Sequence, residues 1–388
     1  MTEPAPFAPP GELCTSFSQA IRAAGLSFGS DHDWLVRCFL CSALAKPLLI
    51  LTGLSGSGKT QLALKLGEWL GEHKYRVVPV RPDWTGPEWL LGYEDALLPV
   101  EQSRRAWHVP EALQLMIQAA HDPAQLYLLI LDEMNLAHVE RYFADVLSGI
   151  ESREPVIPNL GLDDTGHWRI PPGQPPKLEM PRNLIIVGTV NADETTYMFS
   201  PKVLDRANTI EFRVSTDALP IDPARIVRPT RCAAASARDI ASLLRICLDD
   251  AWQAGASSRI SKLATLIRQV HGGLSVHGFE FGHRTYYEGL RLAALLDACG
   301  VDDGNDILDV FVLQKVLPRL NGSRRKLEPV LRSLGAFAFE KHAVIGSAAD
   351  FDVLAPPAGK QPVLRRTFAK VARLMRALHA NQFASFAD

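Results

Sequence analysis

A segment near the start of the chain has the residue types and spacing that bind a nucleoside triphosphate. Gly53-Leu-Ser-Gly-Ser-Gly-Lys-Thr60 fits the pattern GxxxxGK[ST]. Its glycines let backbone N–H groups turn inward around phosphate oxygens, and the helix that follows adds the positive end of its dipole. Lys59 would neutralise the β- and γ-phosphates, and the Thr60 hydroxyl would bind Mg²⁺. The predicted nucleotide contacts are Gly53, Leu54, Ser55, Gly56, Ser57, Gly58, Lys59, Thr60 and Gln61.

Two acidic residues follow a later apolar run, in Leu128-Leu-Ile-Leu-Asp132-Glu133. An acid at the end of a buried strand can hold the Mg²⁺ shell, and the next acid can orient and activate a water molecule. The alternative is that Asp132 only caps the next helix. Because a phosphate-binding loop precedes this pair, we favour Asp132 as a metal ligand and Glu133 as the catalytic acid.

Asn191 follows the next apolar run, residues 184–190. Its amide would hold the attacking water between the γ-phosphate and Glu133. An asparagine at a strand end is often only a turn residue. The order along the chain, with the phosphate-binding loop first and the acid pair second, favours the catalytic interpretation of Asn191.

Two arginines extend this candidate set. Arg206 is predicted to reach the γ-phosphate of a neighbouring subunit and to stabilise transition-state charge. The alternative role of Arg206 is an intrachain salt bridge with Asp205 or Glu211. Arg284, at the start of a later predicted helix, would contact the nucleotide of its own chain, and the alternative there is a solvated or core-paired arginine.

The segments around these residues alternate between strands and helices. Apolar runs predict strands at 47–52, 75–80, 126–131 and 184–190, and helical periodicity predicts helices at 60–71 and 139–150. Continuously apolar runs are typical of strands buried on both faces of a parallel sheet. The alternation therefore predicts an α/β fold with a mostly parallel, doubly wound sheet.

Composition shifts predict the domain organisation. The predicted parts are a poorly structured lead-in at 1–30, a nucleotide-binding domain at 31–213, a proline-rich linker at 214–232, and an α-helical lid with C-terminal helices at 233–388. Long insertions at 81–108 and 152–182 interrupt the second part. They are rich in Trp, Pro and Gly, and they are interpreted either as binding elements or as insertions that pack their own tryptophans.

The bulk composition excludes several classes of protein. A net charge of -2 means that nucleic acid could be bound only by a local patch or by another subunit. No apolar run approaches the roughly 20 residues of a membrane span, and we expect a cytoplasmic protein with reduced thiols. Cys38 and Cys41 are predicted to be buried rather than to bind zinc, because no second pair has suitable spacing. The most basic block is predicted to be a solvated face, with nucleic-acid contact as the alternative: Arg319, Arg324, Arg325, Lys326 and Arg332.

Longer stretches resemble the McrB-like AAA+ ATPases, the motor subunits of modification-dependent restriction systems and related anti-phage systems. The resemblance covers about residues 45–335. It is carried by KPLLILTGLSGSGKTQLA (46–63), LLILDEMNLAHVERYFADVLSGIE (128–151), VGTVNADETTYMFSPKVLDRANTIEF (187–212), RPDWTGPEWLLGY (81–93), FGHRTYYEGLRLAALL (281–296) and LQKVLPRLNG (313–322).

The resemblance implies a hexameric ring with nucleotide between subunits. It implies Walker A and B roles for Lys59, Thr60, Asp132 and Glu133, sensor 1 at Asn191, an arginine finger at Arg206 and sensor 2 at Arg284. The two insertions resemble the helix-2 insert and the pre-sensor-1 hairpin of this AAA+ branch, which face the central pore. The implied partner is a McrC-like nuclease subunit, with DNA handled through that partner or the pore loops.

Two departures from the family bear on the function. Only about 30 residues precede the core, where family members carry a domain that reads DNA, so target recognition is expected on another subunit or in a truncated segment. The best-known member uses GTP and has Asn-Thr-Ala-Asp where this chain has Asn191-Ala-Asp-Glu194. We therefore favour ATP, with GTP left open. The competing functions are a MoxR-like remodelling chaperone and a nucleotide-gated assembly switch.

Overall fold

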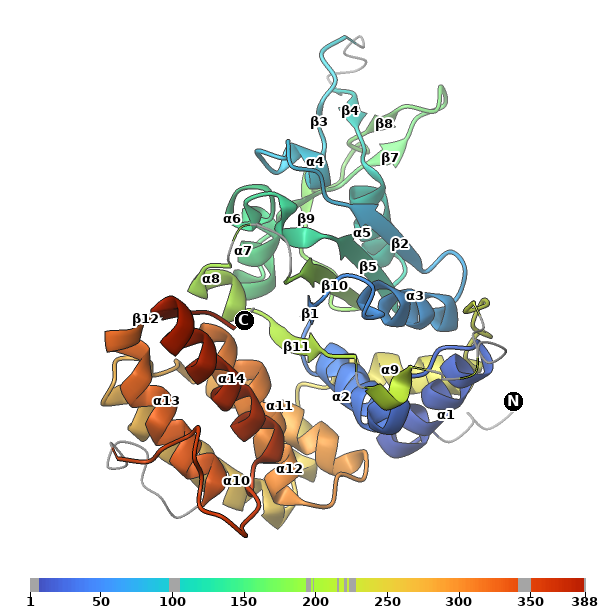
Figure 1. Cartoon of the computed structure of the whole chain (residues 1–388). Coiled ribbons are helices and arrows are strands. Elements are labelled where there is room, and N and C mark those ends of the chain that lie inside the picture. The colour runs from blue at the N-terminus through green and yellow to red at the C-terminus, as the bar shows by residue number, and fades with distance from the viewer. Residues whose placement is uncertain are drawn as a thin grey trace. The chain divides into compact units, whose positions relative to one another are not determined.

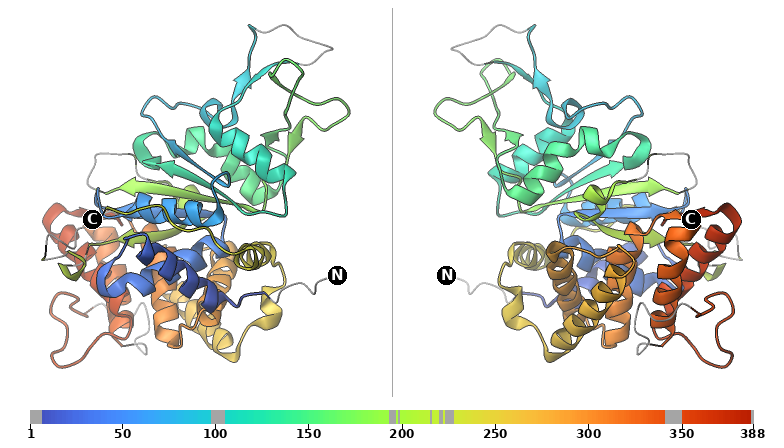
Figure 2. Two further views of the ribbon diagram at one scale, coloured as in Figure 1. Left: turned by 90° about the vertical axis from the view of Figure 1, so that its right-hand side faces the viewer. Right: turned by 90° about the vertical axis from the view of Figure 1, so that its left-hand side faces the viewer.

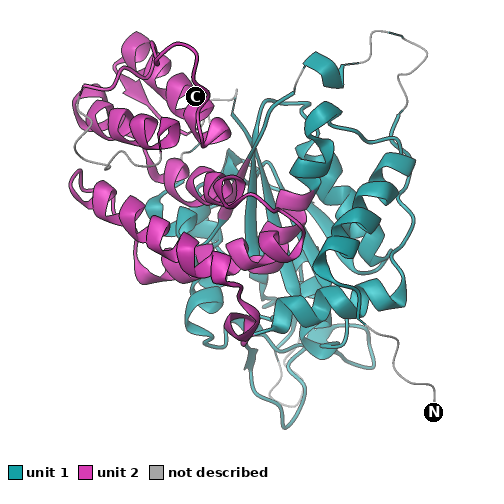
Figure 3. Cartoon of the chain, turned by 90° about the horizontal axis from the view of Figure 1, so that it is seen from below, with its two compact units in different colours: residues 1–36, 46–207, 211–249 teal, residues 37–45, 208–210, 250–388 magenta. Residues whose placement is uncertain are grey.

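The computed structural model describes residues 7–97, 105–192, 197, 199–214, 216–219, 222, 228–340 and 350–386. Residue contacts divide the chain into two compact units (Figure 3). The first contains residues 1–36, 46–207 and 211–249, and the second contains residues 37–45, 208–210 and 250–388.

A five-stranded sheet has the order β11-β1-β10-β5-β2 (Figure 1). Its strands are β1 (Leu48–Gly53), β2 (Tyr75–Pro79), β5 (Tyr127–Asp132), β10 (Leu184–Asn191) and β11 (Asn208–Phe212). Strand β10 pairs in parallel with both β1 and β5, and β2 pairs in parallel with β5. The predicted α/β fold with a mostly parallel sheet is confirmed.

Helices cover both faces of this sheet, as a doubly wound sheet requires. Strands β1 and β10 are buried along their whole length, so side chains on both faces are withdrawn from water. Alternate strand residues such as Leu129 and Leu131 share one core cluster with α5 (Glu111–His121) and α7 (Ala144–Ser152). Helix α3 (Lys59–Leu70) contacts four of the strands and lies outside that cluster, on the other face.

The N-terminal segment is more ordered than the sequence predicted. Residues 10–23 form α1 (Pro10–Ala23), which begins with a proline, a residue favoured in the first turn of a helix. Leu13, Phe17 and Ile21 recur at helical spacing and are fully buried, and the Phe17 ring lies 4.9 Å from that of Trp69 in α3. The prediction of a poorly structured lead-in over 1–30 is therefore wrong for α1, because its apolar face packs on the nucleotide-binding core.

The boundary between the two units differs from the predicted start of the lid. Helix α9 (Ala237–Leu248) belongs to the first unit, because its residues bind the N-terminal segment. Arg238 forms an ion pair with Glu12 of α1, and the Ser242 hydroxyl accepts the Ala8 N–H at 2.8 Å. Part of the predicted linker at 214–232 lies outside the described residues, and its described part includes a 3₁₀ turn at Thr216–Ala218.

The two predicted insertions form short antiparallel strands. The first contains α4 (Glu88–Leu91), β3 (Tyr93–Glu94) and β4 (Trp107–His108), and the second contains β6 (Ile157–Pro158), β7 (Gly161–Leu162), β8 (Trp168–Arg169) and β9 (Lys177–Leu178). A β-bridge between Ala106 and Arg169 joins them, and Figures 1 and 2 show the two hairpins side by side. The buried Trp84 ring stacks on Trp89 at 6.0 Å, so this insertion does pack tryptophans of its own. Residues 98–104 lie outside the described part.

The second unit is helical, as expected for the C-terminal region. Its helices include α10 (Ser258–Ser275), α11 (His283–Ala298), α12 (Gly304–Phe311), α13 (Arg324–Phe339) and α14 (Arg365–Asn381), together with the C-terminal half of α2 (His32–Ala45). Strands β12 (Gly322–Ser323) and β13 (Phe383–Ala384) pair antiparallel. Cys38 and Cys41 are buried, as predicted, and Cys41 Sγ lies 3.2 Å from Cys299 Sγ. No helix within the described ranges is both long and apolar enough to cross a membrane.

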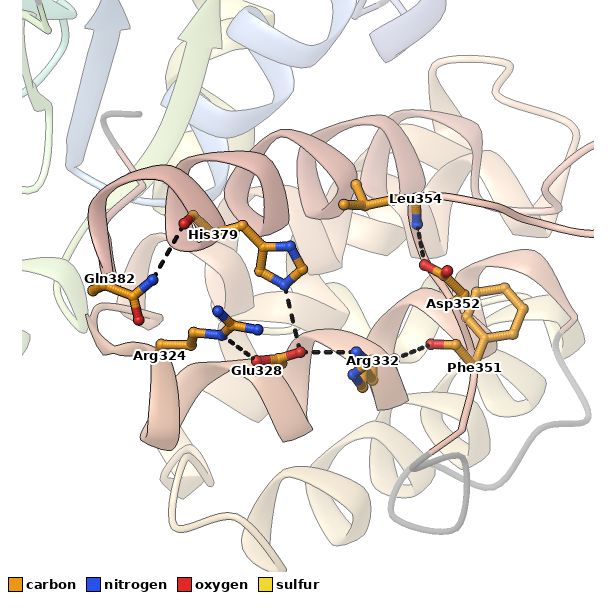
Figure 4. Close-up of polar contacts among 8 residues, drawn as sticks. All are labelled: Arg324, Glu328, Arg332, Phe351, Asp352, Leu354, His379 and Gln382. Carbon is orange, nitrogen blue, oxygen red and sulfur yellow. Dashed lines mark hydrogen bonds and ion pairs between the residues drawn. The ribbon is translucent and has the colours of Figure 1, made fainter.

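Most of the basic block lies on α13, where one acid partly neutralises it (Figure 4). Glu328 accepts hydrogen bonds from Arg324 at 2.7 Å and Arg332 at 2.8 Å, and His379 of α14 lies 3.4 Å from the same carboxylate. The bond from Arg324, followed by that from Arg332, lowers the pKa of Glu328 to about 2. Two arginines of the basic block therefore form ion pairs with a carboxylate of their own helix.

Replacing Glu328 with Gln is expected to lower the free energy of unfolding by about 1 kcal/mol at pH 7, because two arginines lose their shared partner. A carboxylate with a lowered pKa stabilises the fold above its unfolded-state pKa, so the difference should shrink as the pH falls from about 4.3 towards 2. Urea unfolding at several pH values measures this difference. Glu340→Gln is the control. Glu340 forms an ion pair with Lys360, and their side chains are 55% and 65% exposed, so this pair should contribute little to stability. Equal losses in the two variants would contradict the prediction.

Candidate functional site

The predicted phosphate-binding loop connects β1 to α3 in the first unit. Gly58 precedes the first residue of α3 with φ +96, a left-handed conformation that favours glycine. Gly53 has φ +147, and a Cβ there would lie 2.3 Å from the carbonyl oxygen of Phe212. The loop therefore needs glycine at both positions, and it places the N-terminus of α3 where phosphate oxygens can approach.

Lys59, the first residue of α3, points back over the loop. Its side chain is buried, and Nζ donates to the carbonyl oxygens of Gly53 at 2.8 Å and Leu54 at 2.6 Å. A lysine charge in this position lies at the centre of the loop, so the motif's cation and its backbone N–H groups face the same ligand.

The two predicted metal ligands meet although they are 72 residues apart in the sequence. Asp132 is the last residue of β5, and Thr60 is the second residue of α3. The Thr60 hydroxyl donates to Asp132 Oδ1 at 2.8 Å. Both are oxygen ligands of the kind that Mg²⁺ uses when it binds one or two protein groups and the phosphates of a substrate. The donor set fits that ion.

Glu133 follows β5 in an unusual backbone conformation. Its φ of 55 and ψ of 47 place it in the left-handed region, which costs a non-glycine residue about 1–3 kcal/mol and is found mainly at functional sites. Asn191, at the end of β10, donates from Nδ2 to Glu133 Oε1 at 3.0 Å. The amide and the carboxylate that the sequence assigned to the attacking water are thus in contact.

The strand order explains this contact. Strand β10 lies between β1 and β5 in the sheet, and Asn191 is in register with Gly53 of the loop. The carboxyl ends of parallel strands share one edge of the sheet, where open α/β sheets bind their ligands. Asn191 therefore lies between the phosphate-binding loop on one neighbouring strand and Glu133 on the other.

One residue of the site was missed in the sequence. Thr189 of β10 is buried, and its hydroxyl donates to Asp132 Oδ1 at 2.7 Å while accepting the backbone N–H of Glu133 at 3.0 Å. A weak signal was present, since Thr189 is a polar residue in an otherwise apolar run and lies two residues before Asn191, on the same face of the strand.

Arg206 has a partner that the sequence did not predict. It follows α8 (Pro201–Leu204) in the first unit and forms an ion pair with Glu151 of α7, while its Nη1 donates to the Lys202 carbonyl at 2.7 Å. The alternatives considered in the sequence were Asp205 and Glu211. The Arg206 side chain is 12% exposed, and its action on a neighbouring subunit stays a prediction.

Arg284 is the second residue of α11 and is half-buried within the second unit. The predicted start of a helix at this point is confirmed, whereas the predicted contact with nucleotide stays a prediction. The residues that the structure brings together are therefore Lys59, Thr60, Asp132, Glu133 and Asn191, with Thr189 added.

Much of the second unit matches a protein-family model. A family described as a domain of unknown function (DUF8727) matches residues 241–383, which include Arg284 but no other predicted site residue. No curated protein matches the chain. A crystal structure of a candidate ATPase from Cytophaga hutchinsonii ATCC 33406 is similar with a TM-score of 0.49 and 12% sequence identity, over 79% of this chain and 88% of that chain.

Taken together, the site residues provide the parts needed to cleave a phosphoanhydride bond. The loop and Lys59 would face the phosphates of a bound nucleotide, and Thr60 with Asp132 offers ligands for Mg²⁺. Glu133 is a carboxylate held by an amide at the place where a water molecule would attack. Binding alone would not need this last pair, so the arrangement favours hydrolysis.

Proposed function

We propose that this chain is a P-loop ATPase of the AAA+ type that hydrolyses ATP with Mg²⁺. The observation that carries the proposal is the convergence of three distant segments at one edge of the sheet. Asp132 meets Thr60 of the loop at 2.8 Å, and Glu133 meets Asn191 at 3.0 Å. A glycine-rich turn that arose by chance would have neither a metal-binding acid nor an oriented carboxylate beside it.

Each residue has a specific task in this proposal. Backbone N–H groups of the loop and Lys59 hold the β- and γ-phosphates, and Thr60 and Asp132 hold Mg²⁺, which neutralises charge on those oxygens when bound. Asn191 holds Glu133 in place, and Glu133 accepts a proton from the attacking water. Arg206 would complete the site of a neighbouring subunit, and Arg284 would contact the nucleotide bound by its own chain.

The finer proposal is that the chain acts in a ring of six subunits as the motor for a McrC-like nuclease in DNA restriction or anti-phage defence. Support comes from the sequence resemblance over residues 45–335 and from the two insertions, which are joined by the Ala106–Arg169 bridge and would supply loops facing the pore. DNA would then be bound by these loops or by the nuclease. The six cysteines of this chain form no disulfide within the described residues, which fits a protein of the reducing cytoplasm.

Stimulation of ATP turnover tests this role. The rate should rise when duplex DNA and the protein of the neighbouring open reading frame are added together. A rate that responds to a protein client alone would indicate a MoxR-like remodelling chaperone. Ring assembly with nucleotide but negligible turnover would indicate an assembly switch.

Lys59→Ala is expected to weaken ATP binding at least 10-fold, because it removes a charge-assisted contact worth about 1.5–3 kcal/mol. Calorimetry with ATP and Mg²⁺ measures this loss, and Lys262→Ala, on the exposed face of α10, is the matched control. Unchanged affinity in a folded Lys59→Ala protein would remove the assignment of the loop. GTP turning over much faster than ATP in the native protein would overturn the proposed base preference.

A further inference from the structure

Thr189 lies at the centre of the candidate site and is almost fully buried. It lies on β10 between the strand that carries the loop and the strand that carries the acids, and only 2% of its surface is exposed. Its hydroxyl makes two hydrogen bonds, as the donor in one and the acceptor in the other. It donates to Asp132 Oδ1 at 2.7 Å and accepts the backbone N–H of Glu133 at 3.0 Å.

The first bond fixes the proposed metal ligand. Asp132 Oδ1 also accepts the Thr60 hydroxyl at 2.8 Å. One hydroxyl from helix α3 and one from strand β10 therefore meet at the same carboxylate oxygen. A carboxylate oxygen that accepts two hydrogen bonds keeps its position, and removing an outer partner of a metal ligand, such as Thr189, typically changes metal affinity or activity 10- to 100-fold.

The second bond fixes the proposed catalytic acid. Glu133 is in the left-handed region, and a non-glycine residue stays there only when its surroundings hold it. The structure holds Glu133 at two points, its backbone N–H on Thr189 and its carboxylate on Asn191. Both anchors belong to β10, two residues apart, so one rigid strand sets the backbone and the side chain of Glu133.

We propose that Thr189 is a positioning residue that fixes the Mg²⁺-binding Asp132 and the catalytic Glu133 relative to each other through one hydroxyl. Its effect on turnover rests on the proposed function, whereas its hold on the Glu133 backbone does not. A valine side chain has nearly the same shape as threonine but cannot make either bond, and a serine side chain can make both.

The test compares Thr189→Val with Thr189→Ser. For Thr189→Val we expect kcat for ATP to fall 10- to 100-fold, with KM changed less than about threefold, and the gain in ATP affinity on adding Mg²⁺ to fall about 10-fold in calorimetry. Thr189→Ser should recover most of the native kcat and most of the gain in ATP affinity on adding Mg²⁺. A third variant, Thr209→Val, controls for valine in a buried strand of the same sheet, since the Thr209 hydroxyl makes no hydrogen bond within the described residues.

A measurement on the nucleotide-free protein separates this inference from the proposed function. Hydrogen exchange at the Glu133 amide should be faster in Thr189→Val than in the native protein or in Thr189→Ser, whether or not the protein hydrolyses ATP. Unchanged exchange would overturn the inference. Native kinetics in a folded Thr189→Val would also overturn it, as would a Thr189→Ser protein as slow as Thr189→Val, because the methyl group rather than the hydroxyl would then matter. If exchange is faster in Thr189→Val but the native protein shows no ATP turnover, only the proposed function is overturned.

Discussion

Glu133→Gln should bind ATP as the native protein does and lose at least 10²-fold in turnover. A general base contributes about 10²–10⁴-fold, and an amide cannot accept the proton of the attacking water. The carbonyl oxygen of Gln can still accept the Asn191 hydrogen bond, which measures 3.0 Å in the native protein. Binding and position are therefore preserved while the base is removed, and the variant should accumulate as an assembled ring with ATP bound.

Phosphate release and calorimetry, measured on the same preparation, check this result. Glu154→Gln, at an exposed position after α7, is the control for a change of charge. A Glu133→Gln protein that hydrolyses ATP at the native rate would show that the acids at the end of β5 are structural. A variant that fails to bind ATP would instead show that Glu133 belongs to the binding machinery.

The second large effect concerns Arg206. If one chain supplies Lys59, Asp132 and Glu133 and its neighbour supplies Arg206, then Arg206→Ala should bind ATP but turn over about 10³–10⁵-fold more slowly. Turnover per chain in the native protein should rise with protein concentration. Mixing Arg206→Ala with Lys59→Ala should restore part of the activity, because a mixed interface can combine an intact loop with an intact arginine.

The ion pair between Arg206 and Glu151 supplies the control that distinguishes a catalytic from a structural arginine. If Arg206 acts only through this pair, Glu151→Gln should lower turnover as much as Arg206→Ala does. If Arg206 acts on a neighbouring site, Glu151→Gln should keep most of the turnover. Full activity of a single chain at high dilution would defeat the proposal. So would a mixture of co-assembled variants that is no more active than either variant alone.

Many of the site's residues could be predicted because their chemistry depends on local patterns. The loop needs Gly53 and Gly58 for backbone conformations that other residues resist, so its sequence pattern is visible in one segment. Asp132 and Asn191 were visible because each follows a mostly apolar run, and such runs are typical of buried parallel strands.

The sequence by itself therefore determined the fold class, the phosphate-binding loop and the strand ends that carry polar groups. Tertiary structure decided which partners those groups have. Thr189 meets Asp132 across 57 residues of sequence, and Arg206 meets Glu151, an acid that the sequence did not single out. Tertiary structure also decided that residues 10–23 form a packed helix. A short amphipathic helix is stable only when other residues cover its apolar face, as Trp69 covers Phe17 here. The physical reason is the same in each case. Strand register and helix docking place side chains to within a hydrogen-bond length, and they result from packing between distant segments that no local pattern records.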